Sequence, residues 1–195
     1  MENYINSFFE EVKNSLKLVS PIEIAKAFRI LHATYERDGR IYAIGNGGSL
    51  AIANHLVNDL NKTVFGQRIG KPIKRFQAIC LPSTGAELTA WANDLGYEMI
   101  FAGPLKNYIQ ETDCLVAVSN SGNSKNIIKA AEVAKNYNVP IVALVGFDGG
   151  ELLKLGDAKI LVPTEKGRYD LVESVHNIII HLITKYFQDL ISHQS

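Results

Sequence analysis

The sequence lacks an excess of charge of either sign, a set of cysteines and a long hydrophobic run. Its 20 lysines and arginines balance 20 aspartates and glutamates, so composition gives no reason to expect a nucleic-acid-binding protein. The two cysteines, Cys80 and Cys114, cannot form a disulfide framework, and their apolar surroundings predict buried, unreactive thiols. No hydrophobic run approaches the ~18 residues that a membrane span needs, and the first residues do not resemble a signal peptide. We therefore expect a cytoplasmic protein without a membrane partner.

What the sequence does have is the composition of an ordinary globular protein. Its 195 residues, 47% of them hydrophobic, predict a single domain over 1–195. Apolar residues spaced for one helix face predict helices at 4–18 and 21–35. We expect these two to form an N-terminal helical hairpin over 1–37, and residues 38–195 to form an α/β core that ends in a long helix.

In residues 38–195 a short apolar run, a turn and a helical pattern follow one another repeatedly. The expected strands are 40–44, 76–81, 114–118, 141–145 and 160–162. The expected helices run to about 62, 93 and 137, with a short one after 150 and a long one over 171–190. Apolar strands that alternate with helices are typical of a parallel sheet covered on both faces. We predict a three-layer α/β sandwich with a five-stranded parallel sheet.

Two loops that follow predicted strands are suited to binding phosphate. The loop 119–124 (Ser-Asn-Ser-Gly-Asn-Ser) has three hydroxyls beside a glycine, and the helix after it offers free N–H groups and a partial positive charge. A serine-rich capping turn is the alternative for this loop. The loop 46–49 (Asn-Gly-Gly-Ser) also follows a strand, where open α/β sheets bind ligands. Neither loop has the lysine of a Walker A motif or the dinucleotide-binding spacing, so we predict no nucleotide cofactor.

Acid–base or metal-binding residues stand at helical spacing in two places. His55 and Asp59 are four residues apart and share one helix face, as do Glu173, Asn177 and His181 on the last helix. Histidine with a carboxylate is a common zinc-binding or acid–base set, although a lone helix histidine is more often structural. Glu173 and His181 are ~12 Å apart along the helix axis. Contributions from different subunits would ease their meeting at one centre.

The last helix is apolar around most of its circumference. A helix of this kind is buried in a core or in an interface. Together with the long amphipathic first helix, it predicts a homo-oligomer.

A basic segment separates the first predicted helix of the core from the second predicted strand. Residues 61–75 contain no acid, and we expect a solvated loop there. The alternative is an arm that attracts a phosphate, in this subunit or a neighbouring one. Its charged residues are Lys62, Arg68, Lys71, Lys74 and Arg75.

The motifs, taken in order, resemble the sugar isomerase (SIS) domain family, and within it the phosphoheptose isomerases. The resemblance is carried by 46–49, His55, 93–97, 119–124, and by Val175-His176 with His181. It implies a flavodoxin-like SIS fold and a homotetramer with shared active sites. It also implies conversion of sedoheptulose 7-phosphate to glycero-manno-heptose 7-phosphate, for the heptose of lipopolysaccharide or capsule.

The same resemblance implies a role for each matching residue. Ser119, Ser121 and Ser124 would hold the phosphate. Asp59 would move a proton between C1 and C2, with His181 as its acid–base partner. One zinc ion per subunit would be held by His55, Asp59, Glu173 and His181. The remaining sugar contacts would come from Asn46, Gly47, Gly48, Ser49, Asn93, Asp94, Asn120 and Glu173.

Two residues depart from the family pattern. Asp59 stands where the family has glutamate, so its carboxylate is about 1.5 Å shorter in reach, and a misplacement of ~1 Å can cost ~10²-fold in rate. Glu173 replaces a glutamine, and the added charge suits Zn²⁺ while also admitting a hard divalent ion. Two alternatives therefore stay open. One is an isomerase of another sugar phosphate, and the other is a non-catalytic SIS protein that binds sugar phosphates or a replication initiator protein.

Overall fold

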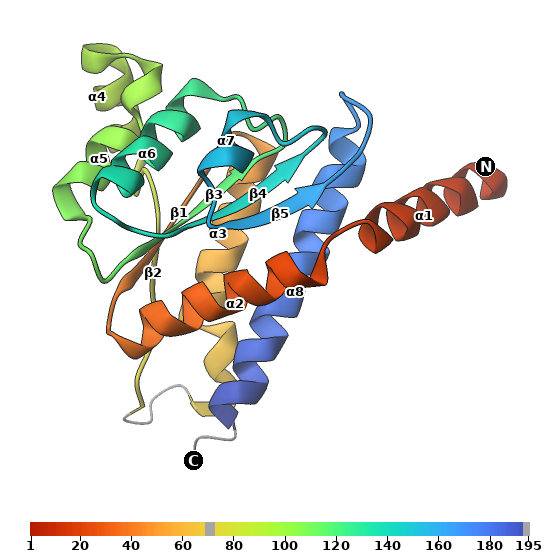
Figure 1. The fold of residues 1–195 in the computed structure, drawn as a ribbon, viewed down its shortest axis with the longest axis horizontal. Helices are drawn as coiled ribbons and strands as arrows, with labels where there is room; N and C mark the ends of the chain where they lie inside the picture. The colour runs from red at the N-terminus through yellow and green to blue at the C-terminus, as the bar shows by residue number, and fades with distance from the viewer. Residues whose placement is uncertain (69–72, 193–195) are drawn as a thin grey trace.

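The computed structural model describes residues 1–68 and 73–192, and it confirms the predicted α/β fold (Figure 1). Five strands form one sheet in the order β2-β1-β3-β4-β5, and every neighbouring pair is parallel. Strand β1 lies between β2 and β3, and its Ala43 is paired with Cys80 of β2 on one side and Val116 of β3 on the other. The strands are β1 (Arg40–Gly45), β2 (Gln77–Cys80), β3 (Cys114–Ser119), β4 (Ile141–Gly146) and β5 (Ala158–Val162).

Helices cover both faces of this sheet and make a three-layer sandwich (Figure 1). One layer contains α2 (Pro21–Glu36), α3 (Gly48–Asn61) and the long α8 (Tyr169–Ser192), with α1 (Glu2–Lys17) packed on α8. The opposite layer contains α4 (Gly85–Leu95), α5 (Ala102–Tyr108), α6 (Lys125–Asn136) and α7 (Gly150–Leu155). A short 3₁₀ turn, η2 (Tyr97–Met99), links α4 to α5.

The sheet has a hydrophobic core on each face, which explains the unbroken apolar strands. Successive strand residues point to opposite faces, so Ala43 packs toward α2, α3 and α8 while Ile44 packs toward α5, α6 and α7. Every residue of β3 and β4 is buried. Because both faces are covered, these strands carry no alternating polar residues.

The two N-terminal helices are present as predicted, but they do not fold back on each other as a hairpin. The Ser20 hydroxyl accepts the Glu23 N–H at 3.4 Å and Pro21 begins α2, so the new helix starts after only a short bend. Helix α2 then packs on β1 and β5, whereas α1 packs on α8 and projects from the body (Figure 1). The hairpin prediction is wrong because the apolar residues of each helix face other elements.

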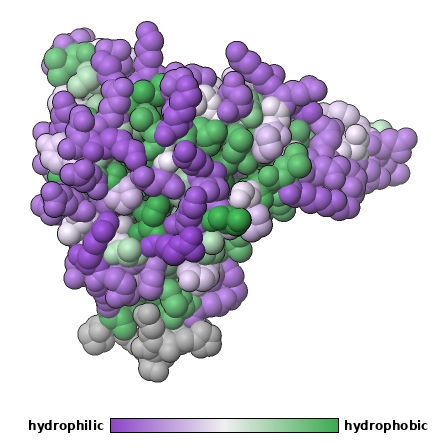
Figure 2. All heavy atoms as spheres, viewed as in Figure 1, coloured by the Kyte–Doolittle hydropathy of each residue, from purple (hydrophilic) through white to green (hydrophobic). Residues whose placement is uncertain are grey.

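Helix α1 leaves large hydrophobic side chains in solvent. Tyr4 is 78% exposed and Phe9 63% exposed. The face in Figure 2 is mainly hydrophilic toward the tip of the projecting helix, and hydrophobic residues gather where the helix meets the body. An uncovered apolar surface of this kind is typical of a contact between proteins.

Two segments differ from the sequence prediction. Helix α5 was not expected, because its seven residues include Pro104 and resemble a turn. Part of the basic segment, η1 (Thr63–Arg68), forms 3₁₀ turns on either side of a kink at Gly66 rather than a loop. Lys74 pairs with Asp38 at 3.2 Å, and the Arg75 guanidinium lies 4.5 Å from the centre of the Phe65 ring. Lys71 lies outside the described residues.

Among the residues that the structure describes, no helix combines the length and the apolar content needed to cross a membrane.

Candidate active site

The loops after β1 and β3 lie side by side at a reversal of the strand order. From β1 the chain moves outward to β2, and it then returns to place β3 on the other side of β1. At such a switch point the two loops diverge and leave a crevice at the carboxyl ends of the strands. Asn46 and Asn126 bridge it with two amide hydrogen bonds of 3.0 and 2.9 Å. The Tyr97 hydroxyl also donates to Asn46 Oδ1, at 3.1 Å.

The crevice contains a cavity of about 240 Å³, which we call the serine pocket. It brings together all three serines predicted to hold phosphate, and residues from both predicted loops. Its lining residues are Asn46, Ser49, Val118, Ser119, Asn120, Ser121, Ser124, Tyr169 and Glu173. A second cavity, lined in part by Tyr97, Glu98 and Lys125, shares Asn46 and Ser124 with it.

The shape of the loop 119–124 depends on one glycine. Gly122 has φ of 61°, and a Cβ atom there would lie 1.9 Å from the carbonyl oxygen of Gly149. Only glycine fits this left-handed, crowded position. The chain can therefore turn tightly between Ser121 and Ser124, and Ser124 becomes the residue that precedes α6. Serine hydroxyls and the positive end of α6 thus face one small space, an arrangement suited to an anion.

A carboxylate also enters the serine pocket. Asn120 donates a 2.8 Å hydrogen bond from Nδ2 to Glu173 Oε1. A Cβ atom on Gly48 would lie 2.5 Å from the same carboxylate oxygen, so Glu173 sits against the first turn of α3. The positive end of that helix stabilises the negative charge. Among the described residues, Asn120 Oδ1 is buried without a hydrogen-bond partner, so it is an acceptor that a ligand hydroxyl could satisfy.

The predicted acid–base residues form a second cluster, which we call the His–Asp–His cluster. His55, Asp59 and His181 each offer a ligand atom, and these atoms lie within 4.8 Å of one another. His55 Nε2 is 3.4 Å from Asp59 Oδ2, and the two imidazole centroids are 4.9 Å apart at 77°. Asp59 is buried, and its Oδ2 accepts a 3.0 Å hydrogen bond from Thr184. His181 is exposed, so the cluster opens to solvent.

Helices α3 and α8 run side by side in constant register. Gly48 lies against the Glu173 carboxylate, Asp59 is hydrogen-bonded to Thr184, and the Thr63 carbonyl oxygen is hydrogen-bonded to Gln188. The two residues of each pair are 125 positions apart in the sequence. The serine pocket lies at the start of both helices, and the His–Asp–His cluster lies farther along them. Eleven residues of α-helix separate Gly48 from Asp59, which is about 16 Å. In one chain Glu173 therefore belongs to the serine pocket and not to the cluster with which it was predicted.

Two other predicted sugar contacts lie outside the serine pocket of the same chain. Asn93 and Asp94 are exposed on α4, and the Asn93 amide donates to the Asp94 carboxylate at 2.7 Å. Asp94 lines a shallow depression together with Trp91 and Leu95.

Three residues that sequence reasoning passed over touch the two sites. Tyr169 lines the serine pocket, Tyr97 holds Asn46, and Thr184 holds Asp59. Tyr97 belongs to the segment 93–97 that carries the family resemblance, although no role was assigned to it. Thr184 stands three residues after His181 and so shares its helix face.

One histidine and two thiols, all at least partly buried, have strongly shifted pKa values and no place in either site. Burial lowers the pKa of His176 to about 4, although its ring nitrogen lies 3.3 Å from the Val145 carbonyl oxygen. His176 is therefore neutral and ties α8 to β4. Burial raises the pKa of the Cys80 thiol to about 11 and that of Cys114 to about 12. Both thiols are protonated at neutral pH, as unreactive cysteines should be.

Comparison with known proteins agrees with this architecture. The SIS domain family model matches residues 7–146. A phosphoheptose isomerase from Helicobacter pylori (strain P12) is 32% identical over 186 residues, which cover 95% of this chain and 93% of that protein.

Two solved structures are similar over nearly the whole chain. The phosphoheptose isomerase of Francisella tularensis has a TM-score of 0.84 and 28% identity, with coverage of 96% of this chain and 97% of that one. The phosphoheptose isomerase of Neisseria gonorrhoeae has a TM-score of 0.82 and 26% identity, with coverage of 96% and 98%. The chain belongs to the SIS domain family and, within it, to the phosphoheptose isomerases.

Proposed function

We propose that this protein interconverts sedoheptulose 7-phosphate and glycero-manno-heptose 7-phosphate, and so supplies heptose for bacterial lipopolysaccharide or capsule. The observation that carries the proposal is the pairing of two sites on helices α3 and α8. The serine pocket suits a phosphate, and the His–Asp–His cluster suits proton transfer. Relatives with 32% and 39% identity carry the name phosphoheptose isomerase, which supports the same activity.

The serine pocket would hold the phosphate end of the substrate. Ser119, Ser121 and Ser124 supply hydroxyl donors, and the first turns of α3 and α6 supply positive helix ends. The unpartnered Asn120 Oδ1 would accept a hydrogen bond from a sugar hydroxyl. Asn46, Gly47, Gly48 and Ser49 would form the other wall.

The reaction needs one base and one acid. From the ketose, a base removes a proton from C1 while an acid protonates the C2 oxygen, which gives an enediol. The proton then returns to C2 as the C1 hydroxyl loses its own proton, which gives the aldose. We assign the carbon proton to Asp59, whose carboxylate is held by Thr184, and the oxygen protons to the exposed His181. Positioned general acids and bases of this kind contribute ~10²–10⁴-fold each.

The His–Asp–His cluster also fits a divalent metal ion. Two imidazoles and a carboxylate form a donor set typical of zinc, and the hydrogen bond from Thr184 fixes the carboxylate as metal sites require. We propose that His55, Asp59 and His181 hold zinc, which would supply Lewis-acid polarisation of a substrate oxygen. Glu173 lies in the serine pocket of the same chain, so it could act as a fourth ligand only for another subunit.

The separation of the two sites supports a shared active site. A seven-carbon chain has six C–C bonds, as many as the backbone of two residues, so it spans about 7 Å. Gly48 and His55 are seven residues apart on α3, about 10 Å along the axis, and Gly48 and Asp59 about 16 Å. We propose a cytoplasmic homotetramer in which one subunit's pocket faces another subunit's cluster. Asn93 and Asp94 would reach the sugar across the same interface.

Assay of sedoheptulose 7-phosphate isomerisation tests the proposal. We expect turnover by the native protein and a loss of about 10²–10⁴-fold in kcat for Asp59→Asn and for His181→Ala. Asp189→Asn, an exposed change on α8, is the control, because among the described residues its carboxylate pairs with Lys185, at 2.5 Å, and with no residue of either site. Absence of turnover on any heptulose or hexulose phosphate would rule out the enzyme. Tight binding of sugar phosphates without turnover would instead identify a non-catalytic SIS protein, the alternative that the shorter Asp59 leaves open.

A further inference from the structure

Tyr169 is an aromatic side chain at the edge of the serine pocket. It is the first residue of α8, it lines the pocket and it is half-exposed. Its neighbours there are mainly hydroxyls and amides, which suit the phosphate. An aromatic ring has no such role and suits the carbon chain that the phosphate carries.

The ring of Tyr169 rests on a second aromatic ring from another element. Phe147 follows β4, and its ring meets that of Tyr169 edge to face, with centroids 5.1 Å apart at 80°. Phe147 is buried, and its φ of 57° lies in the left-handed region. This conformation is rare for a bulky residue and is retained only when the surrounding structure enforces it. The strained backbone thus places a rigid support beneath Tyr169.

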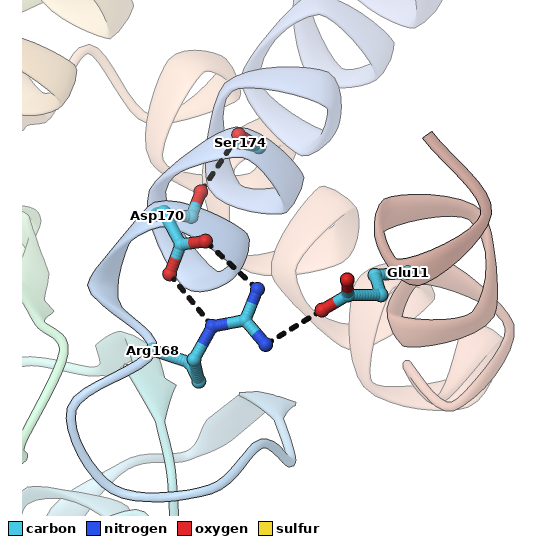
Figure 3. Close-up of polar contacts among 4 residues, drawn as sticks. All are labelled: Glu11, Arg168, Asp170 and Ser174. Atoms are coloured by element: carbon cyan, nitrogen blue, oxygen red, sulfur yellow. Dashed lines mark hydrogen bonds and ion pairs between the residues drawn. The ribbon is translucent and has the colours of Figure 1, made fainter. Parts of the chain in front are cut away.

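Ion pairs fix the two residues that flank Tyr169 (Figure 3). The Arg168 guanidinium donates to both carboxylate oxygens of Asp170, at 3.1 and 2.9 Å. Its third nitrogen donates to Glu11 of α1 at 2.6 Å. Ser174 adds a 2.7 Å bond to the Asp170 carbonyl oxygen. A bidentate pair of this type restricts geometry as well as contributing energy, so the segment 168–170 is anchored to both α1 and α8.

We propose that Tyr169 is a specificity-determining residue: its ring packs against the carbon chain next to the phosphate and favours a phosphorylated sugar over phosphate alone. Arg168 is the positioning residue that holds this ring over the pocket by bridging Glu11 and Asp170. The inference rests on the proposed function only in taking a sugar phosphate as the ligand of the serine pocket.

Binding of two ligands separates the ring from the phosphate site. We expect Tyr169→Ala to raise the Kd and KM for sedoheptulose 7-phosphate about three- to tenfold, the range of an aromatic contact, with kcat near the native value. The Kd for inorganic phosphate, which cannot reach the ring, should stay within about twofold. Tyr169→Phe keeps the ring and should behave as the native protein. The proposal would be overturned if Tyr169→Ala weakened the binding of both ligands equally, or if it did not weaken the binding of sedoheptulose 7-phosphate.

Variants of Arg168 test the positioning role. Like Tyr169→Ala, Arg168→Ala should weaken the binding of sedoheptulose 7-phosphate and leave the binding of inorganic phosphate unchanged. Arg168→Lys should recover part of the lost affinity for the sugar phosphate. Lys13→Ala is the matched control, because Lys13 also forms an ion pair on α1, with Glu10 at 3.0 Å, but does not reach α8. If Lys13→Ala weakened the binding of sedoheptulose 7-phosphate as much as Arg168→Ala does, the positioning role of Arg168 would be refuted.

Calorimetric titration keeps this test independent of turnover. If the native protein binds sedoheptulose 7-phosphate but does not isomerise it, the proposed reaction fails while the comparison of Tyr169→Ala with Tyr169→Phe still decides the role of the ring. If turnover is normal and both variants bind like the native protein, only the inference about Tyr169 fails.

Discussion

Replacing Thr184 by valine would remove one hydroxyl beside the Asp59 carboxylate and leave the shape of the side chain almost unchanged. In the native structure this hydroxyl is 3.0 Å from Asp59 Oδ2 and 3.0 Å from the Ile180 carbonyl oxygen. Thr184 and Asp59 are each about 6% exposed, so water cannot readily take the place of the lost donor. The change therefore tests whether α8 holds the proposed base of α3 in position.

The expected loss follows from the charge and the burial of the acceptor. A hydrogen bond to a charged group contributes about 1.5–3 kcal/mol. For a protein of this size that corresponds to a fall in Tm of about 3–12 °C. If the cluster binds zinc, loss of a group that orients a ligand should weaken the metal about 10–100-fold. Isomerase activity should fall with it, because the carboxylate is then free to rotate.

The matched control is Thr34→Val. Thr34 is also buried on a helix, and its hydroxyl bonds the carbonyl oxygen four residues back at 2.9 Å, but no carboxylate is involved. Thermal unfolding of the two variants, with metal chelated, measures the hydrogen bond, and competitive zinc titration measures the ligand geometry. Equal Tm values for the two variants together with native zinc affinity in Thr184→Val would refute the reasoning.

Three further predictions concern the fold and the assembly. Burial holds the pKa of His176 near 4, so as the pH falls the unfolded chain binds a proton at this histidine before the folded chain does. The neutral buried histidine therefore contributes up to about 3 kcal/mol of stability. This contribution is fully present above about pH 6.5 and is lost as the pH falls toward 4. Denaturant titrations at several pH values should show a flatter profile for His176→Leu. Phe9→Glu places a charge on the exposed apolar face of α1, and light scattering should then report a smaller assembly with an unchanged helix content. Finally, mixed oligomers of Ser121→Ala and Asp59→Asn subunits should recover activity that neither variant has alone, whereas sites complete within one chain would give no recovery.

The sheet could be predicted because every strand carries a strong local signal. Runs such as 114–118 and 141–145 are apolar on both faces, a pattern that only a strand covered from two sides requires. Helix α5 could not be predicted, since Pro104 and a length of seven residues erase its periodicity. The arrangement of α1 and α2 was also beyond the sequence, because an amphipathic stripe shows that a face is buried but not which element buries it.

The candidate site residues likewise include some that the sequence could predict and some that it could not. The loop 119–124 was recognisable because its hydroxyls and glycine are adjacent in the sequence, and the spacing of His55 and Asp59 is equally local. Tyr169 was missed because its support comes from the ring of Phe147 and from the ion pair of Arg168 with Glu11, and both contacts join residues far apart in the sequence. A lone tyrosine before a helix gives no signal of its own.

The parallel register of α3 and α8 supports the proposal that the active site is shared between chains. The pocket that holds Glu173 and the cluster that holds Asp59 lie on the same two helices, and rigid backbones keep them apart at about 10–16 Å along the axes. Both helices are continuous over the described residues, so their backbones hold the two sites at this separation within one subunit. A second copy can instead bring its cluster to the first copy's pocket without any change in backbone. The exposed apolar face of α1, tied through Arg168 to the first turn of α8, provides a surface on which such an assembly could form.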